Sequence, residues 1–329
     1  MKKLALAMTL FAASEGMAFA QSNVTVYGVV DANVTYEKNG GPAGSVLRLD
    51  SGGQSGSRLG FRGIEDLGGG LSASFVLENG LLADTGAAAQ GGLLFGRQAW
   101  VGLTGAPGSV KLGRQNNAVF NTMIALDPFG VALAGDSSRL FNLYGFRMNN
   151  TASYATPAMG PFSGQVLYGF GEVAGNTTAS RQIGASASYA GGPLLLTVAY
   201  HNAENALGTD SAKTTIVGGT YDFHVIKAHL AYAFNKGVGT LDTRDALIGV
   251  TVPLGSVTLL ASYIRKDDRV NANADANQIA LGASWELSKR TNLYSSVGRT
   301  ANDSLVSYGG AGAPGATDRL FNVGIRHKF

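Results

Sequence analysis

The nine residues Phe321-Asn322-Val323-Gly324-Ile325-Arg326-His327-Lys328-Phe329, with which the chain ends, decide its fold class. In an extended strand, successive side chains point to opposite faces. One face of this segment therefore carries Phe321, Val323, Ile325, His327 and Phe329, and the other carries Asn322, Gly324, Arg326 and Lys328. Segments with the same alternation and low overall hydrophobicity recur along the chain, which is typical of a transmembrane β-barrel.

Alternation with a period of two is clearest in three further segments, which span residues 24–36, 71–78 and 278–287. In total about sixteen candidate strands can be counted, and ~10 tilted residues suffice for a strand to cross the membrane. The sequence therefore predicts an all-β fold, a 16-stranded antiparallel transmembrane β-barrel. No domain boundary is visible between residues 21 and 329.

The connections alternate in length, as a barrel built of hairpins requires. Tight turns are expected at 67–70, 106–109, 191–193 and 253–255, and longer loops at 37–54, 84–92, 267–275 and 300–317. Aromatic residues near strand ends fit a girdle at the membrane interface, or ordinary strand composition. They are Tyr36, Tyr189, Tyr200, Phe234 and Tyr294.

The N-terminus predicts export. Lys2 and Lys3 precede an apolar run at 4–13, and Ala18-Phe19-Ala20, with small residues at its first and third positions, precedes Gln21. This order is that of a secretory signal peptide over residues 1–20. The apolar run is about half as long as the ~20 residues of a membrane-spanning helix, so it does not predict an anchor.

The composition excludes several classes of protein. Only 14% of the residues are charged, and no apolar stretch is long enough for a membrane-spanning helix. The chain has no cysteine, which argues against a disulfide-stapled module and a thiolate metal site. Its formal net charge of +3 comes without the clustered basic surface that nucleic-acid binding requires.

One connection is much longer than the others. Residues 115–146 lack sustained alternation and contain Asp127-Pro128-Phe129-Gly130 and Asp136. Loops of this length are usually functional. The apolar residues of this segment indicate that it packs against another part of the protein. Folding into the barrel lumen would narrow the pore, and a lid outside the barrel is the alternative.

Five short motifs are specific in combination. They are SRLGFRGIEDLGGGL at 57–71, LGR at 112–114, YATP at 154–157, LSKRT at 287–291 and VGIRHKF at 323–329. Through them the chain resembles the general porins of Gram-negative bacteria, particularly the beta-proteobacterial type. The resemblance implies a sixteen-stranded barrel with an inward-folded third loop and a homotrimer. It also implies that Phe329 and its strand are the signal read by the barrel assembly machinery. We further expect contact with outer-membrane lipid and lipopolysaccharide.

Charged residues at the constriction would set the charge preference of such a pore. Guanidinium groups that face carboxylates create a transverse field across a narrow aqueous channel. The candidates for the basic wall are Arg58, Arg62, Arg97 and Arg147. Alternation supports a lumen position for all but Arg97, whose assignment depends on the resemblance. A rim residue that reaches the lipid headgroups is the alternative for Arg97.

Three carboxylates are candidates for the acidic side of the constriction. Glu78 shares the polar parity of Ser72 and Ser74 and should lie near Arg58. The other two are Asp127 and Asp136 in the long connection, for which a solvated charge or a helix cap is the alternative. If the arginines outnumber the facing carboxylates, the channel should prefer anions.

Other apparent motifs do not predict a function. The sequence GAGAPG at 310–315 matches a dinucleotide-binding pattern literally, but no helix follows it. Residues 271–275 lack the later acidic ligand and the glycine turn of a Ca²⁺-binding loop. The histidines are scattered over different segments, so we expect no metal and no cofactor. They are His201, His224, His229 and His327.

The function predicted from the sequence is that of an outer-membrane porin, a water-filled channel for passive diffusion of small hydrophilic solutes and ions, with a preference for anions. Three alternatives remain open. They are a substrate-selective outer-membrane channel, a surface adhesin or immune-facing barrel, and an outer-membrane enzyme. We do not expect an enzyme, because no spacing indicates a Ser–His pair and no G-x-S-x-G elbow is present.

Overall fold

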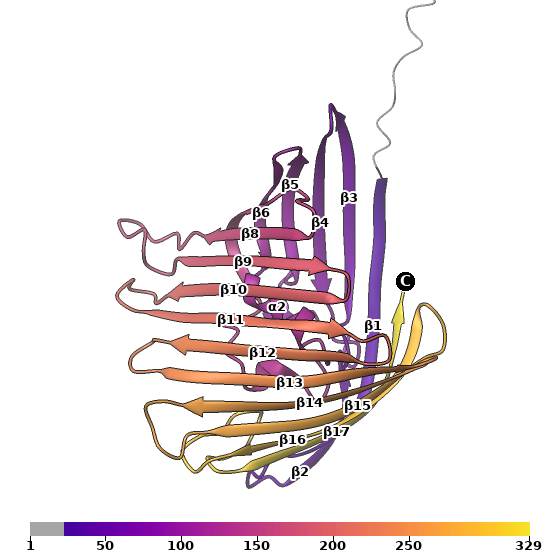
Figure 1. Cartoon of the computed structure of the whole chain (residues 1–329), viewed down its shortest axis with the longest axis vertical. Coiled ribbons are helices and arrows are strands. Elements are labelled where there is room, and N and C mark those ends of the chain that lie inside the picture. The colour runs from indigo at the N-terminus through magenta and orange to yellow at the C-terminus, as the bar shows by residue number, and fades with distance from the viewer. Residues whose placement is uncertain (1–22) are drawn as a thin grey trace, which may run out of the picture.

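The computed structural model describes residues 23–329, so the predicted signal peptide at 1–20 lies outside the described residues. The described chain is nearly all β (Figure 1). Its strands are β1 (Asn23–Lys38), β2 (Ser45–Ser51), β3 (Arg58–Gly68), β4 (Leu71–Gly80), β5 (Gln98–Gly105), β6 (Gly108–Asn116), β7 (Arg147–Ala155), β8 (Phe162–Gly169), β9 (Gln182–Gly191), β10 (Leu194–Glu204), β11 (Ser211–Asp222), β12 (Lys227–Lys236), β13 (Asp242–Leu254), β14 (Val257–Asp268), β15 (Ala276–Glu286), β16 (Thr291–Asn302) and β17 (Thr317–Lys328). Its helical segments are η1 (Gln90–Gly92), α2 (Ala118–Leu126) and η2 (Ser137–Arg139).

Every strand pairs with its neighbours in antiparallel fashion, and the ring closes between the first strand and the last. β1 pairs with β17 on one side. On its other side β1 pairs with β2 near one end and with β3 near the other. β2 and β3 are therefore two parts of one strand that is interrupted at 52–57. The predicted closed, sixteen-stranded antiparallel barrel is confirmed, and closure leaves no strand edge unpaired.

The loop expected at 37–54 is shorter than the sequence indicated. β1 continues to Lys38, and β2 begins at Ser45. β2 buries none of its seven residues, so its burial pattern is uninformative. Its strand conformation is fixed instead by pairing with β1. In this pairing Ala32 lies opposite Ser51 at one end and Lys38 lies opposite Ser45 at the other. Partner pairing of this kind is invisible in the periodicity of the segment itself.

The two faces of the wall differ in exposure. On β12 the side chains of Leu230, Tyr232 and Phe234 are exposed, whereas Ala231 and Ala233 are buried. The exposed apolar side chains form the outer face, and we call the opposite face the inner face. Tyr294 was expected in the aromatic girdle, but this expectation is wrong. Tyr294 is 2% exposed and donates to Asp31 Oδ1 at 2.5 Å on the inner face.

The main buried core lies between the inner face and α2. Asn117 caps this helix, because its side chain accepts a hydrogen bond from the backbone N–H of Phe120 at 2.7 Å. The helix ends before Asp127-Pro128, since a residue that precedes proline avoids the helical conformation. Buried helix residues pack against small and aliphatic wall residues. They are Val119, Phe120, Met123 and Leu126 against Ala199, Ile216, Ala231, Ala233, Leu247 and Ile264. Within residues 23–329, no helix has the length and apolar character needed to cross a membrane.

Candidate functional site

A polar cavity of about 760 Å³ lies between two parts of the chain. One side consists of β1 to β3 and β17 with the interruption at 52–57, and the other side is the segment 117–146 between β6 and β7. Residues 81–97, between β4 and β5, also contribute to its lining. The charged residues that line the cavity are Arg48, Arg58, Arg97, Arg147, Asp50, Asp84 and Asp136.

Three of the four predicted arginines meet in this cavity. The Nε of Arg97 pairs with Glu78 Oε1 at 2.7 Å, and the Nε of Arg147 donates to the carbonyl oxygen of Arg97 at 2.8 Å. Arg58 and Arg147 both lie within electrostatic reach of Arg97. Within residues 23–329, no hydrogen bond or ion pair engages the Arg58 guanidinium. The cluster therefore holds three cations around one directly bonded carboxylate.

Glu78 belongs to this cluster but is not paired with Arg58, the partner that the sequence suggested. It is 5% exposed, and besides Arg97 it accepts a hydrogen bond from the Tyr27 hydroxyl at 2.9 Å. In the strand register Glu78 lies opposite Gly60, and Arg58 lies opposite Gly80. The pairing with Arg97 depends on the path of residues 81–97, which strand periodicity does not specify.

Arg62 lies apart from the other three arginines. Its guanidinium carbon lies 5.2 Å from the centre of the Tyr27 ring, a cation–π arrangement, and its side chain is exposed. Gly60 is the residue opposite Glu78, and Arg62 lies two residues further along β3, toward the short turn at 68–70. Arg62 is not among the residues that line the cavity.

Asp127 also occupies a different place from the one expected. It is 3% exposed, and its carboxylate accepts hydrogen bonds from the backbone N–H groups of Phe129, Val131 and Ser137 at 2.8, 3.0 and 3.0 Å. Burial raises the pKa of this carboxyl to about 6. Asp127 therefore organises the segment from within and does not face the arginines.

Asp136 does line the cavity, but its carboxylate caps η2. Its Oδ1 accepts from the Ser138 N–H at 2.8 Å. Burial raises the pKa of this carboxyl as well. A helix cap is one of the alternatives that the sequence leaves open for Asp136. In the structure Asp136 both caps η2 and lines the cavity.

Polar contacts attach the segment 117–146 to the wall. The carbonyl oxygen of Leu126 is bonded to His229 Nδ1 at 3.0 Å, and the Ala134 N–H donates to Ser296 Oγ at 3.0 Å. Arg139 forms an ion pair with Asp318 on β17. These contacts involve β12, β16 and β17, so the segment is held at several strands.

The interruption at 52–57 enters the cavity from the opposite side. Asp31 Oδ2 accepts hydrogen bonds from the backbone N–H groups of Gln54 and Ser55 at 3.0 and 2.7 Å. The Gly53 carbonyl oxygen accepts from the Leu133 N–H at 2.9 Å, which joins the interruption to the segment 117–146. The two elements therefore touch each other beside the cavity.

Two further charged residues of the cavity lining, Arg48 and Asp50, are not among the candidates from the sequence, although their spacing is a signal. Arg48 and Asp50 are two positions apart on β2 and so share a face. Arg48 Nε pairs with Asp50 Oδ2 at 2.8 Å, and its Nη1 pairs with Glu37 at 2.5 Å. The expected loop at 37–54 contains this segment, so the sequence prediction does not include its alternation.

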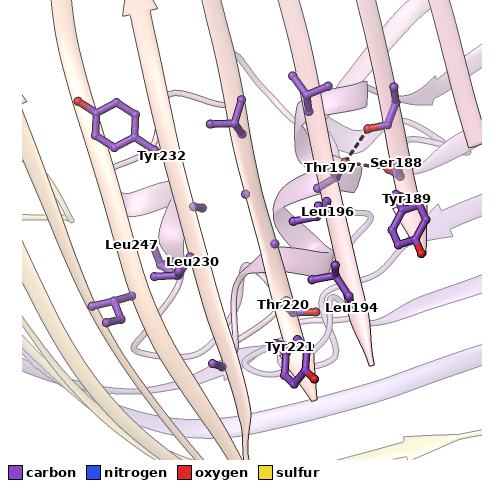
Figure 2. Close-up of a pocket in the computed structure, with 18 of the residues that line it drawn as sticks. Ser188, Tyr189, Leu194, Leu196, Thr197, Thr220, Tyr221, Leu230, Tyr232 and Leu247 are labelled. Carbon is purple, nitrogen blue, oxygen red and sulfur yellow. Dashed lines mark hydrogen bonds between the residues drawn. The ribbon is translucent and has the colours of Figure 1, made fainter. Parts of the chain in front are cut away.

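A larger apolar hollow of about 1330 Å³ lies on β8 to β14 (Figure 2). It includes the exposed side chains of Leu196, Leu230 and Ile248 and thus belongs to the outer face. Arg265 is the one charged residue of its lining among those described. Despite its size, the hollow is remote from the arginine cluster. Residues 23–329 contain no group of three or more His, Cys, Asp or Glu that could hold a metal ion.

Known proteins resemble this chain over its whole length. The family model described as Gram-negative porin matches residues 5–305. "Outer membrane porin protein 32" of Delftia acidovorans is 34% identical, and an outer membrane porin of Bordetella pertussis is 30% identical; each alignment covers 100% of both chains. A major outer membrane protein P.IB of Neisseria gonorrhoeae is 26% identical with the same coverage.

Solved structures agree with these sequence relationships. The anion-selective porin from Comamonas acidovorans superposes with a TM-score of 0.84 at 32% identity, covering 94% of this chain and 100% of that one. The trimer form of OmpT from Vibrio cholerae gives a TM-score of 0.72 at 16% identity, covering 94% and 99%. The second likeness concerns the fold alone.

Proposed function

Because the chain belongs to the Gram-negative porin family, we propose that its lumen is a passive diffusion channel for small hydrophilic solutes and ions, with a preference for anions. The protein is an outer-membrane porin. Its family and fold are those of non-enzymatic channels, and we propose that it has no enzymatic activity.

The observation that carries the proposed anion preference is the cluster of Arg58, Arg97 and Arg147 around Glu78. Of the carboxylates on the cavity lining, Asp50 is paired with Arg48, and Asp136 is bonded to a backbone N–H. Asp84 lies exposed. The guanidinium groups of Arg58 and Arg147 have no carboxylate partner within the described chain, so positive potential dominates at the cluster. A related porin, from Comamonas acidovorans, is itself called anion-selective.

The constriction is proposed to lie at the polar cavity, between the segment 117–146 and the interruption at 52–57. The hydrogen bond between Leu133 and Gly53 and the packing of α2 against inner-face residues support this position. Arg58, Arg97 and Arg147 would form the basic wall there, and Glu78 and Asp136 would be its acidic members. Arg62 would act outside the narrowest part, and Asp127 would keep the segment folded.

The proposal extends to export and assembly. Residues 1–20 would be removed as a signal peptide, and three copies would associate in the outer membrane, in contact with lipid and lipopolysaccharide. Phe329 would serve as the signal for the barrel assembly machinery.

The deciding experiment is the reversal potential of the purified protein in a planar bilayer under a KCl gradient. We expect ohmic channels and a reversal potential whose sign shows that chloride is more permeant than potassium. The double variant Arg58→Gln/Arg147→Gln should lower the chloride preference, because it removes both unpaired guanidinium groups. Arg290→Gln, on the exposed turn before β16, is the matched control. Cation preference of the wild type, or an unchanged potential in the double variant, would contradict the proposal.

A further inference from the structure

The polar cavity has two chemically different sides. The arginine cluster forms one, and the other comes from apolar residues of the segment 117–146. Those apolar lining residues are Phe120, Ile124, Val131, Leu133 and Phe146. A channel that only conducts hydrated ions has no need of an apolar surface on its lining. Charge preference alone therefore does not account for the apolar side of the cavity.

The cationic side keeps free hydrogen-bond donors. Arg97 uses its Nε for Glu78, and Arg147 uses its Nε for a backbone carbonyl. Within the described chain, the terminal nitrogens of these two side chains and the whole Arg58 guanidinium have no protein acceptor. A guanidinium fork matches the two oxygens of a carboxylate. This side is therefore suited to a compact carboxylate as well as to chloride.

The apolar side is ordered and partly open. The rings of Phe120 and Phe146 are stacked, with centroids 4.4 Å apart and an interplanar angle of 14°. Ile124 is one helical turn after Phe120 on α2 and hence on the same helix face, and it is 43% exposed. Phe146 directly precedes Arg147, so the apolar surface adjoins the arginine cluster along the chain.

We propose that this cavity binds small aromatic carboxylates, with the carboxylate on Arg58, Arg97 and Arg147 and the ring on Ile124 and Phe146. The inference depends on the proposed anion passage and names a class of solute for the same site. The volume of about 760 Å³ falls within the range of roughly 300–1,000 Å³ common for small-molecule sites. A single-ring acid fits within this volume and would obstruct the chloride current while it is bound.

The test compares three probes in single-channel recordings of chloride current at neutral pH. Benzoate has the ring and the charge, acetate has only the charge, and benzyl alcohol has only the ring. Benzoate should block half of the current at a concentration about ten-fold lower than acetate. That factor is the size expected when roughly 60 Å² of apolar surface is covered. Benzyl alcohol should not block.

Two variants separate the contributions of the two sides. Ile124→Ser should lower the ratio of benzoate to acetate affinity by about three-fold or more, since it removes part of the apolar contact. Arg58→Gln should weaken block by both acids. Leu305→Ser is the matched control, because Leu305 is 62% exposed in the loop before β17 and does not line the cavity.

The outcomes distinguish this inference from the proposed function. Chloride preference in KCl together with equal block by benzoate and acetate would overturn the inference alone. An affinity ratio unaffected by Ile124→Ser would do the same. A wild type without chloride preference would overturn both. Chloride preference with ring-dependent, Ile124-dependent block would establish both.

Discussion

The C-terminal residue Phe329 is hydrogen bonded to Gly28 in both directions. The Gly28 N–H donates to the Phe329 carbonyl oxygen at 3.0 Å, and the Phe329 N–H donates to the Gly28 carbonyl oxygen at 3.1 Å. The Phe329 ring occupies the space where a Cβ of residue 28 would lie. Figure 1 shows this end of the chain beside β1. Phe329 thus completes the pairing of the last strand with the first, and its ring packs directly against Gly28.

Gly28→Leu should impair closure of the barrel. The new side chain would collide with the Phe329 ring and with the Arg58 carbonyl oxygen, which lies 2.8 Å from an ideal Cβ. Overpacking of this kind costs about 1–3 kcal/mol. The fraction of folded barrel on unheated SDS gels measures the effect. Val30→Leu is the control, because Val30 lies on the same strand and is 42% exposed. Equal folded fractions in the two variants would contradict the prediction.

Replacement of Phe329 by Asp should reduce assembly more than conduction. The charge would stand where an apolar ring now covers Gly28. The substitution would also remove the proposed C-terminal assembly signal. The amount of the proposed trimer, measured as a heat-modifiable band in outer-membrane fractions, should fall, while channels that do form should keep the wild-type conductance. Normal trimer levels in the variant would refute this.

Glu78→Gln should strengthen the proposed preference for anions. The substitution removes the one carboxylate bonded to the arginine cluster and frees Arg97 Nε from its ion pair of 2.7 Å. A glutamine can still accept the Tyr27 hydroxyl. The reversal potential under a salt gradient should move further toward the chloride value. Glu65→Gln, at an exposed position near the end of β3, should leave it unchanged. An unchanged reversal potential would show that Glu78 does not act on permeating ions, and a shift away from the chloride value would contradict the prediction.

Loss of Lys266 should destabilise the barrel strongly. Lys266 Nζ and Asp245 Oδ1 are 2.6 Å apart, and both side chains are fully buried. Removal of one partner from such a pair costs about 3–5 kcal/mol, because the other charge stays buried without compensation. Urea unfolding in lipid vesicles should show this for Lys266→Ala. The double variant Lys266→Met/Asp245→Leu should recover most of the loss, and failure to recover would assign the effect to packing instead.

Asp127 should make stability depend on pH. Its folded-state pKa of about 6 lies above the value of about 3.9 for an unfolded chain, because burial disfavours the charged form. Between these values the folded protein binds a proton that the unfolded chain does not. The free energy of unfolding therefore falls as pH rises from 4 to 6, by up to about 3 kcal/mol.

The measurement for this prediction is the wild-type unfolding free energy at pH 4, 5, 6 and 7, compared with that of Asp127→Asn. The variant cannot titrate at this position, so the difference between the two proteins isolates Asp127 from other carboxyls. A difference independent of pH would show that the carboxyl is not perturbed by burial.

Local pattern was enough to predict the strands that show one polar and one apolar face. The side chains on the two sides of 321–329 alternate in exposure, with Phe321, Val323 and Ile325 exposed and Asn322 buried. The same logic failed at β2, which buries no side chain and depends on pairing with β1. Proximity to a strand end gave the wrong expectation at Tyr294, which shares the parity of the buried residues Asn292 and Ser296.

The candidate site was predictable only in part. Parity indicated Arg58 and Arg147, and resemblance indicated Arg97, and all three line one cavity. The partner of Glu78 was not predictable, because Arg97 reaches it through the course of residues 81–97. Neither was the burial of Asp127, since its three hydrogen bonds exist only once 127–137 has folded back on itself.

The sequence by itself determined the strand period, the class of barrel and the residue types available to the pore, because alternation along a strand is a local consequence of backbone geometry. The tertiary structure alone decided which charges meet and which are neutralised. Arg58, Glu78, Arg97 and Arg147 come from four different parts of the chain. Their distances follow from strand register, from the interruption at 52–57 and from the packing of α2, none of which is encoded in any one segment.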